Sequence, residues 1–506
     1  MKKTMKLASL ILAMIMVISF VLPVHAANET YEIVINKEET GRQYQAYQIF
    51  VGTLDKDENN KLVLSTIEWG TGVTEDGKTA IGNAQARADK IITAQNAEDF
   101  AKEVAPYLSD TAAIFKYNET NKNYVASNLL PGYYLIKEAD NSLPAEKGYT
   151  AFILKVVGDT EATPKDGETT VIKKVDDKVD SNTTEDEIIW QDSADHDIGD
   201  AIDFKLEATI TDNYAEYDTY YLALHDTEEK GLTFNKDSVK VYVDDVQITS
   251  GYEIVTDAQD GCTFEVVFAN LKNVSAVKAK SVIRVEYQSV LNADAVIGNV
   301  GNVNKVYGEF SNNPNNEQRG KTKEDTVIVF TYEVVVNKVT EKDEPLSGAT
   351  FTLEKFVADE NGTETYKNVK GKWVAISTVE TQPKDEFTFR GLDDGEYRLT
   401  ETEAPALYNK IDPILFTVKA DHEVVWGAQD RKDVLTSFSG DVASGEITFT
   451  ADKASGDIKT KVVNERGLIL PETGGIGTTI FYIVGGLLVV GVVVFLITRK
   501  RMNSNR

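Results

Sequence analysis

Val282-Ile-Arg-Val-Glu-Tyr287 alternates apolar and polar side chains, and this alternation decides the fold class. Successive side chains of a β-strand point to opposite faces, so a period of two marks a strand with one buried face. Val239-Lys-Val-Tyr-Val243 and Phe387-Thr-Phe-Arg-Gly391 show the same alternation, and Gly, Asn and Asp separate such runs. Regular short strands with turn signals predict a mainly β chain of tandem immunoglobulin-like β-sandwich domains.

One stretch departs from this pattern. Residues 83–108 are rich in alanine, carry apolar residues at helical spacing and contain few helix breakers. They predict one or two helices in the N-terminal domain.

Three similar strand-opening segments divide the chain. They are Val34-Ile-Asn-Lys37, Val171-Ile-Lys-Lys-Val175 and Val335-Val-Asn-Lys-Val339. Each begins a unit whose length is typical of a single domain. The predicted domains are therefore residues 27–168, 169–328 and 329–465, and the polar, turn-rich residues 159–170 link the first two.

The N-terminus carries an export signal. Lysines within residues 2–6 precede an apolar run at 7–23 and the small-x-small sequence Val24-His-Ala26. This order is typical of a signal peptide, here residues 1–26, so the chain is predicted to be secreted. An uncleaved membrane anchor is the alternative.

The C-terminus combines three elements in residues 466–506. Leu470-Pro471-Glu472-Thr473-Gly474 precedes an apolar stretch at 476–497 and a basic cluster at 499–501. The apolar stretch is long enough to cross a bilayer as a helix, and the basic cluster holds its end on the cytoplasmic side. The alternative is a single-pass anchor preceded by LPETG by chance.

In this order the three elements resemble a Gram-positive cell-wall sorting signal. The resemblance implies that a sortase cysteine thiolate attacks the Thr473 carbonyl and releases Gly474. An amine then takes over the Thr473 carboxyl. The implied partners are a class C and a housekeeping sortase and peptidoglycan, with the C-terminal helix as a transient membrane anchor.

Composition narrows the function class. The net charge of −28 and the pI near 4.6 argue against nucleic acid or an anionic membrane as a partner. The single cysteine, Cys262, cannot form a disulfide within one chain, and the strand-like run after it predicts a small apolar role. The four histidines lack metal-ligand spacing, and neither a phosphate-binding loop nor a nucleophile elbow is present. We therefore predict no metal, no cofactor and no enzymatic turnover.

The third unit resembles the B-type repeat of collagen-binding surface proteins, in Leu346-Ser-Gly-Ala-Thr-Phe351 and Tyr397-Arg-Leu-Thr-Glu-Thr-Glu-Ala-Pro405. The second segment is similar to the pilin E-box. This resemblance implies an isopeptide bond between Lys338 and Asn464, assisted by Glu401. Burial favours the neutral, nucleophilic amine and the protonated carboxyl, which can polarise the asparagine amide.

The second unit resembles the isopeptide-forming D2 domain of fimbrial backbone subunits. The resemblance lies in Asp197-Ile-Gly-Asp200, in residues 224–234 and in Phe310-Ser-Asn-Asn-Pro314. Strand neighbours point to opposite faces, so only one of two adjacent lysines lies inside. Matching the third unit selects Lys174. The predicted acceptor is Asn312, with Asn313 as the alternative, and the predicted helper carboxyl is Asp226 rather than Glu207.

The first unit is not predicted to carry such a bond. Gly132-Tyr-Tyr-Leu-Ile-Lys-Glu138 is similar to an E-box without its Thr and Pro, and Lys37 is a candidate donor. However, the closing strand near residues 152–157 has no asparagine.

Backbone pilins present a linking lysine at the end of the first domain, commonly after Tyr-Pro. Thr163-Pro164-Lys165 occupies the matching place without the tyrosine, so Lys165 is the predicted linking lysine and Lys155 the second choice. The resemblance thus implies a major pilin, linked from Thr473 of one subunit to Lys165 of an identical subunit, with ancillary pilins as partners and a role in adhesion. A monomeric wall-anchored adhesin is the first alternative, and a wall-displayed enzyme is the second.

Overall fold

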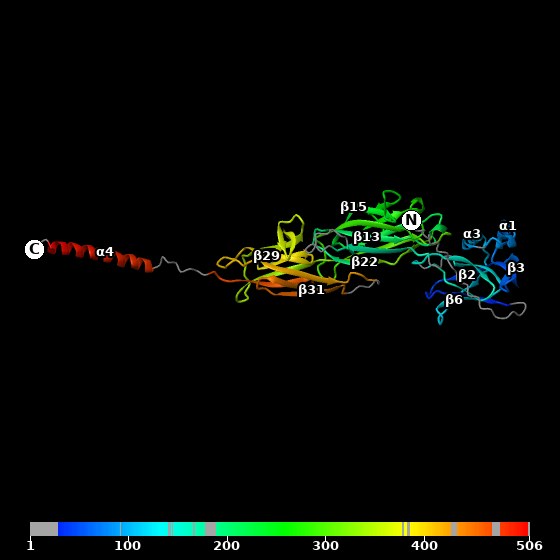
Figure 1. Ribbon diagram of the computed structural model, residues 1–506, viewed down its shortest axis with the longest axis horizontal. Coiled ribbons are helices and arrows are strands. Elements are labelled where there is room, and N and C mark those ends of the chain that lie inside the picture. The colour runs from blue at the N-terminus through cyan, green and yellow to red at the C-terminus, as the bar shows by residue number, and fades with distance from the viewer. Residues whose placement is uncertain are drawn as a thin grey trace, which may run out of the picture.

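The computed structural model describes residues 29–503 except 92, 140–142, 144, 165–166, 178–188, 377–378, 382–384, 427–432 and 468–475. Three β-rich bodies lie in line, and helix α4 (Ile476–Asn503) lies beyond the third (Figure 1). The mainly β, multi-domain architecture with helices near the N-terminus is confirmed. The signal peptide, the LPETG motif and Lys165 lie outside the described residues.

The first body contains two sheets. One has the order β5-β6-β1-β9, and the other has the order β3-β2-β7-β8 with β4 paired to β2. The strands are β1 (Tyr31–Ile35), β2 (Tyr44–Lys56), β3 (Leu62–Trp69), β4 (Ala113–Ile114), β5 (Lys116–Asn118), β6 (Asn123–Leu129), β7 (Gly132–Glu138), β8 (Ala151–Val156) and β9 (Thr160–Ala162).

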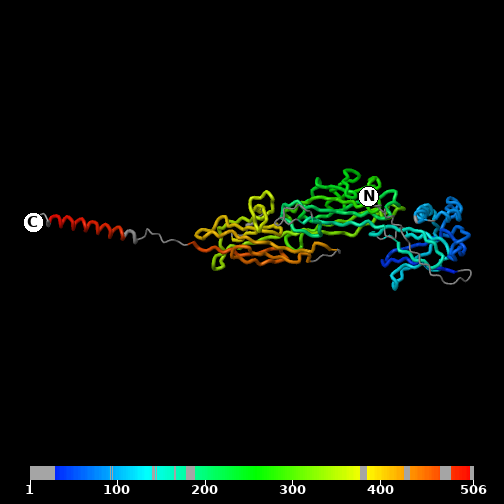
Figure 2. The backbone as a smooth tube through the Cα atoms, viewed as in Figure 1, coloured from blue at the N-terminus to red at the C-terminus, as the bar shows by residue number. Residues whose placement is uncertain are grey.

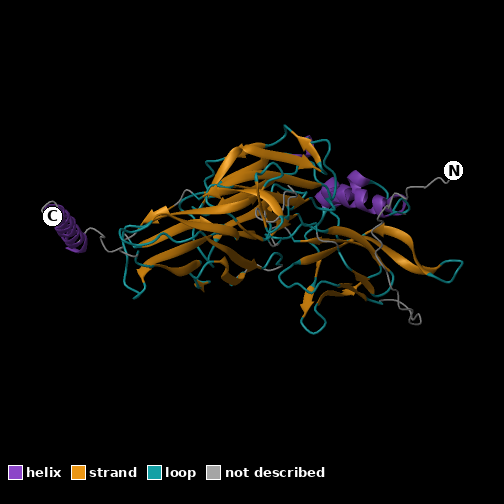
Figure 3. Cartoon of the chain, turned by 60° about the vertical axis from the view of Figure 1, so that its left-hand side comes forward, coloured by secondary structure: helices purple, strands orange, loops and turns teal. Residues whose placement is uncertain are grey.

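Short helices cover the second of these sheets (Figure 3). They are α1 (Glu75–Ile81), α2 (Ala84–Ala88), α3 (Ala94–Val104) and the 3-10 turn η1 (Ala105–Tyr107). Side chains of Thr74, Asn83 and Thr93 accept backbone N–H bonds and so define where the three α-helices begin. The predicted helical stretch at 83–108 is thus confirmed as two helices and a 3-10 turn.

The middle body is a sandwich of two sheets, with strand orders β11-β10-β13-β19-β15-β16 and β12-β22-β20-β14-β18-β17, the latter with β21 paired to β20. Alternate residues along β19 and β20 are buried, as the period-two pattern predicts. The strands are β10 (Thr170–Asp176), β11 (Trp190–Gln191), β12 (Ser193–Asp195), β13 (Ala201–Thr209), β14 (Leu222–Glu228), β15 (Leu232–Val243), β16 (Val246–Ile248), β17 (Glu253–Val255), β18 (Phe264–Phe268), β19 (Val282–Leu291), β20 (Asn302–Ser311), β21 (Arg319–Lys321) and β22 (Asp325–Phe330). Two 3-10 turns, η2 (Tyr214–Glu216) and η3 (Leu271–Asn273), lie between strands.

The third body is also a two-sheet sandwich, ordered β27-β28-β23-β33-β32 and β25-β26-β24-β29-β30-β31. Its first and last strands, β23 and β33, are parallel neighbours. The strands are β23 (Tyr332–Thr340), β24 (Thr350–Ala358), β25 (Glu364–Tyr366), β26 (Val369–Ala375), β27 (Val379–Thr381), β28 (Glu386–Leu392), β29 (Gly395–Glu403), β30 (Ile414–His422), β31 (Leu435–Ser444), β32 (Phe449–Asp452) and β33 (Asp457–Asn464).

Polar contacts join the successive bodies, whose chain path is traced in Figure 2. Between the first and second, the Tyr149 N–H donates to the Asn312 carbonyl over 2.8 Å. Between the second and third, the Lys355 ammonium pairs with Asp197 of the second body over 2.7 Å and with Asp393 of its own body over 2.7 Å. These contacts hold the bodies in a head-to-tail row.

Candidate cross-linking sites and cell-wall anchor

The third body places Lys338 inside its core. Lys338 lies on β23 opposite Val462 of β33, and its side chain is fully buried on the face that also carries Val334 and Val336. Its ammonium donates to the Val462 carbonyl over 2.7 Å. The last strand therefore already holds the lysine head beside Asn464, two residues further along the same face of β33.

Asn464 and Glu401 meet in the same core. The Asn464 side-chain Nδ2 donates to both Glu401 carboxylate oxygens, over 2.9 and 3.1 Å, and both residues are fully buried. Asn464 Oδ1 has no hydrogen-bond partner in the described part of the chain. The structure thus brings together the three side chains that the sequence selected in this unit.

The electrostatics of this site favour an amine nucleophile. Burial lowers the pKa of Lys338 to about 8, although the nearby Glu401 carboxylate acts in the opposite direction. A larger fraction of the lysine is therefore neutral at neutral pH, and a neutral amine can attack the Asn464 side-chain carbonyl carbon.

In the middle body the structure places Lys173, not Lys174, in the core. The inward side chains of β10 are Val171, Lys173 and Val175, while Lys174 is partly exposed and pairs with Asp192. The prediction of Lys174 as the inner lysine is wrong because it relied on a match to the third unit that is shifted by one residue. A shift of one residue reverses the face of every side chain in a strand.

Lys173 lies against the predicted helper Asp226. Its ammonium contacts the Asp226 carboxylate and donates to the Tyr287 hydroxyl over 2.8 Å, and all three groups are buried. Burial lowers the pKa of Lys173 and raises the pKa of Asp226, although each partner opposes the shift of the other. Both shifts favour the neutral amine and the protonated carboxyl. The alternative helper, Glu207, lies on the partly exposed face of β13.

Asn304, rather than Asn312, completes this cluster. Asn304 is fully buried on β20, and its Nδ2 donates to the same Tyr287 hydroxyl over 2.9 Å. Asn312 follows the end of β20 and donates to the Lys147 carbonyl at the junction with the first body. It lies about 26 Å along the strand from Asn304. The structure therefore does not bring the predicted acceptor Asn312, or its alternative Asn313, into this cluster, and Asn304 occupies that place.

Sequence reasoning also missed Glu228 and Tyr287. Asn304 Nδ2 donates to Glu228 Oε1 over 3.2 Å, much as Asn464 donates to Glu401. Burial, with the neighbouring Asp226 carboxylate, raises the pKa of Glu228 to about 7. The sequence signal for Asn304 was its position two residues before Val306 on β20. Residues two apart on a strand share a face, so both side chains point inward.

In the first body the glutamate of the E-box-like segment, Glu138, forms a buried ion pair. The Glu138 carboxylate accepts from the Arg42 guanidinium over 2.6 Å and from the Thr150 N–H over 3.1 Å. Lys37, the candidate donor, is partly exposed. Because a guanidinium stays protonated, Arg42 cannot act as a nucleophile. The absence of an isopeptide bond from the first unit stays a prediction.

The predicted linking lysine, Lys165, lies outside the described residues, but residues 167–169, which follow it in the sequence, are described. Lys147 pairs with Glu168 over 2.6 Å, and Thr169 hydrogen-bonds Tyr220 over 2.7 Å. The chain on the C-terminal side of Lys165 is therefore anchored at the junction of the first two bodies. Lys155, the second choice, lies on β8 and is partly buried.

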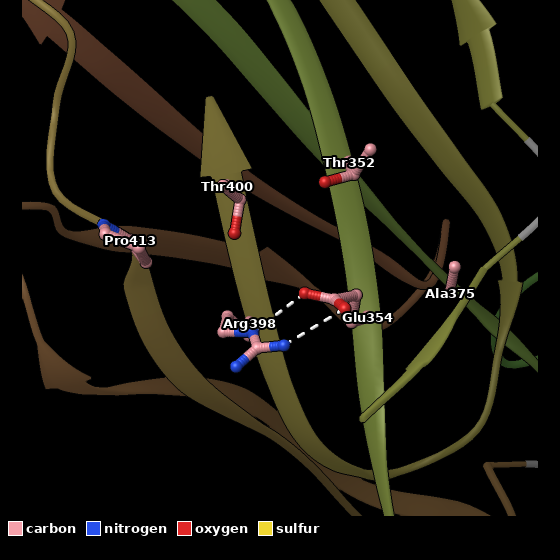
Figure 4. A pocket seen from close by; sticks show the side chains of 6 residues that line it. All are labelled: Thr352, Glu354, Ala375, Arg398, Thr400 and Pro413. Carbon is pink, nitrogen blue, oxygen red and sulfur yellow. Dashed lines mark hydrogen bonds and ion pairs between the residues drawn. The ribbon is translucent and has the colours of Figure 1, made fainter. Parts of the chain in front are cut away.

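A surface hollow in the third body offers no comparable chemistry (Figure 4). Thr352, Ala375, Thr400 and Pro413 line it together with the pair Arg398–Glu354. The Arg398 guanidinium makes two hydrogen bonds to the Glu354 carboxylate, over 2.7 and 3.0 Å, so these charges satisfy each other.

The C-terminal helix α4 matches the predicted transmembrane segment. Within it, Ile480–Arg501 is long and apolar enough to cross a membrane. Its apolar side chains are exposed, as in a helix whose natural surroundings are not water.

Two family models match parts of this chain. Residues 332–432 match "SpaA: Prealbumin-like fold domain", and residues 470–504 match "LPXTG cell wall anchor motif". The first region contains Lys338 and Glu401, and the second contains Thr473.

A curated relative is similar over more of the chain. The trypsin-resistant surface T6 protein of Streptococcus pyogenes is 22% identical over 365 residues, which cover 60% of this chain and 65% of the relative. The match thus spans 65% of the length of that relative.

A solved backbone pilin shows the same fold. The T6 backbone pilin of serotype M6 Streptococcus pyogenes, described as a modular three-domain structure, aligns with a TM-score of 0.52 at 17% identity. The alignment covers 88% of this chain and all of that one (100%). The major pilin SpaD from Corynebacterium diphtheriae aligns with a TM-score of 0.48 at 17% identity, covering 87% of this chain and 98% of that one.

Proposed function

We propose that this chain is the shaft subunit of a surface pilus. Its SpaA-type domain, its cell-wall anchor motif and its T6-like fold support the assignment to the sortase-assembled backbone pilins. A class C sortase joins Thr473 of one subunit to Lys165 of the next, and a housekeeping sortase attaches the finished polymer to peptidoglycan. The observation that carries the proposal is a buried lysine–carboxyl–asparagine cluster in each of the two larger sandwiches.

The proposed role of these clusters is self-cross-linking. In the third domain the Lys338 amine nitrogen bonds to the Asn464 side-chain carbonyl carbon, the C–Nδ2 bond breaks, and ammonia leaves. Glu401 holds the leaving amide nitrogen and supplies the proton exchange that the step needs. The reaction happens once per chain and is not turnover.

The middle domain performs the same reaction with Lys173 and Asn304. The Tyr287 hydroxyl contacts both side chains and so holds the two reacting groups beside each other. Asp226 accepts from the lysine, while Glu228 accepts from the asparagine amide. We assign Asp226 the helper role and Glu228 the positioning of Asn304.

The position of the bonds suits a load-bearing shaft. Lys338 and Asn464 lie on the first and last strands of the third domain, which are parallel neighbours. A covalent link between them carries tension directly from one end of the domain to the other. The proposed domain limits, 27–168, 169–328 and 329–465, place one such link in each of the last two domains.

The polymer is tested on wall extracts of the native organism, boiled in detergent and immunoblotted for this protein. The expected wild-type result is a ladder of high-mass bands, which collapses in a Lys165→Ala strain and persists in a matched Lys155→Ala strain. A ladder that collapses only with Lys155→Ala moves the linkage there. A single band near monomer mass in the wild type would instead support the monomeric wall-anchored adhesin.

A further inference from the structure

Four side chains of metal-binding type gather on the outer face of the middle domain. His225 lies on β14, Asp260 and Cys262 lie in the loop before β18, and Glu265 lies on β18 opposite His225. One nitrogen, oxygen or sulfur atom of each residue lies within 4.8 Å of those of the other three. This His225–Asp260–Cys262–Glu265 cluster is separate from the Lys173 site because His225 and Asp226 point to opposite faces of their strand.

The spacing of these atoms suits a tetrahedral ion. His225 Nδ1 lies 2.9 Å from Asp260 Oδ2 and 3.2 Å from Glu265 Oε1. Cys262 Sγ lies 3.8 Å from Glu265 Oε1. A tetrahedral Zn²⁺ with ordinary bond lengths separates two nitrogen or oxygen ligands by about 3.3 Å and a sulfur and an oxygen by about 3.6 Å. Shifts of a few tenths of an ångström bring these three separations to those values, and the other ligand atoms lie within 4.8 Å of one another.

A second layer of contacts orients the imidazole. His225 is 7% exposed, and its ring stacks on the Tyr307 ring at 4.4 Å between centroids. His225 Nε2 is buried, has no hydrogen-bond partner among the described residues, and faces the Glu309 carboxylate at 4.0 Å. Metal-bound histidines characteristically direct their second nitrogen at a carboxylate, which fixes the tautomer that leaves Nδ1 for the metal. The Tyr307 hydroxyl also donates to Asp260 over 2.7 Å.

We propose that this cluster binds one Zn²⁺ ion. The donors are one imidazole nitrogen, one thiolate sulfur and two carboxylate oxygens, a set that favours zinc over the oxygen-preferring Ca²⁺ and Mg²⁺. Asp260 is exposed, so an ion can enter from solvent. The bound ion ties the loop of Asp260 and Cys262 to β14 and serves as a staple in a domain that has no disulfide.

The sequence prediction of no metal rested on the spacing between histidines. The proposed ligand set contains a single histidine, so it leaves no such spacing in the sequence. His225 and Asp260 are separated by 35 positions and meet because β14 and β18 pair in one sheet. Only the last three ligands are close in sequence.

Cobalt substitution tests the proposal directly. The full chain, purified in mild detergent and reduced with a phosphine, is titrated with Co²⁺ and followed by absorption spectroscopy. Because the chain contains a single cysteine, a thiolate-to-cobalt charge-transfer band can arise only at Cys262. The expected result is one equivalent of Co²⁺ with this band and with the visible bands of a tetrahedral ion, and displacement by Zn²⁺.

Variants then separate the ligands from their surroundings. Cys262→Ser should abolish the charge-transfer band and weaken Zn²⁺ binding at least about 10-fold, and Glu309→Gln should weaken it by about 10–100-fold. A matched control, Glu253→Gln on the neighbouring edge strand, should leave both unchanged. An unaltered thermal unfolding curve without metal shows that each variant is folded. Absence of the band in the wild type overturns the proposal, as does Zn²⁺ binding that Cys262→Ser leaves unchanged.

Discussion

Replacing Lys338 by methionine tests the proposed covalent link in the third domain. Methionine fills a similar volume, and in the cross-linked wild type the Lys338 nitrogen is part of a neutral amide, so the substitution removes no buried ion pair. The change also leaves the Val462 carbonyl without its 2.7 Å donor, which costs about 1 kcal/mol. A large loss of stability would therefore come from the missing cross-link.

The magnitude follows from the chain that the link closes. Treated like a disulfide, a bond from Lys338 to Asn464 closes a loop of about 127 residues and stabilises the domain by about 5 kcal/mol. For a domain of this size, each kcal/mol shifts Tm by about 3–5 °C, so the third domain should unfold about 15–25 °C lower in Lys338→Met.

The assay combines intact mass with calorimetry of the full chain. Wild type should lack one ammonia for each bond, and Lys338→Met should regain one and show a lower unfolding transition for the third domain. Glu401→Gln, which keeps the lysine and the asparagine, should also retain that ammonia. Lys461→Met is the matched control because Lys461 is an exposed lysine of β33 paired with Asp343, and such surface pairs contribute about 0–1 kcal/mol.

Two results would refute the reasoning. A wild-type mass with no ammonia missing would mean that the buried cluster does not react. An ammonia count that Lys338→Met leaves unchanged would mean that the bond in this domain uses another amine.

Three further outcomes are expected. Lys173→Met should restore one ammonia to the intact mass, whereas Lys174→Met should not; the reverse result would return the donor role to Lys174. Burial and nearby carboxylates raise the pKa of Asp394 at the junction of the second and third domains to about 8, so the folded state holds a proton that an exposed carboxyl has released by neutral pH. Its contribution to stability is therefore present at low pH and is lost as pH rises from about 4 to about 8. Thermal unfolding should accordingly occur at higher temperature at pH 5 than at pH 8, and an equal difference in Asp394→Asn would contradict this. In the first domain, Arg42→Met leaves Glu138 buried without the Arg42 cation. The free energy of unfolding measured in urea should therefore fall by about 3–5 kcal/mol. An unchanged free energy of unfolding would mean that the pair is solvated.

Local patterns in the sequence determined much of the architecture. The period-two alternation predicted sandwiches. A strand with one polar, solvent-exposed face has one apolar face, which packs against a second sheet. The alanine-rich stretch predicted the helices, and the E-box segment predicted Glu401, since its short motif fixes which residue of β29 points inward. Lys338 and Asn464 followed from the same match, and the structure brings all three together.

The sequence did not decide which side chains of a strand face the core, or which side chains of other strands they contact there. Lys173 and Lys174 are chemically identical neighbours, and only the register of β10 on β13 decides which one enters the core. Asn304 is one of several asparagines near β20, and its selection depends on contact with Tyr287 from another strand. The His225 cluster likewise arises from pairing of β14 with β18. A local pattern sets the phase of each strand, but sheet pairing sets which phases meet, and that is a property of the tertiary structure alone.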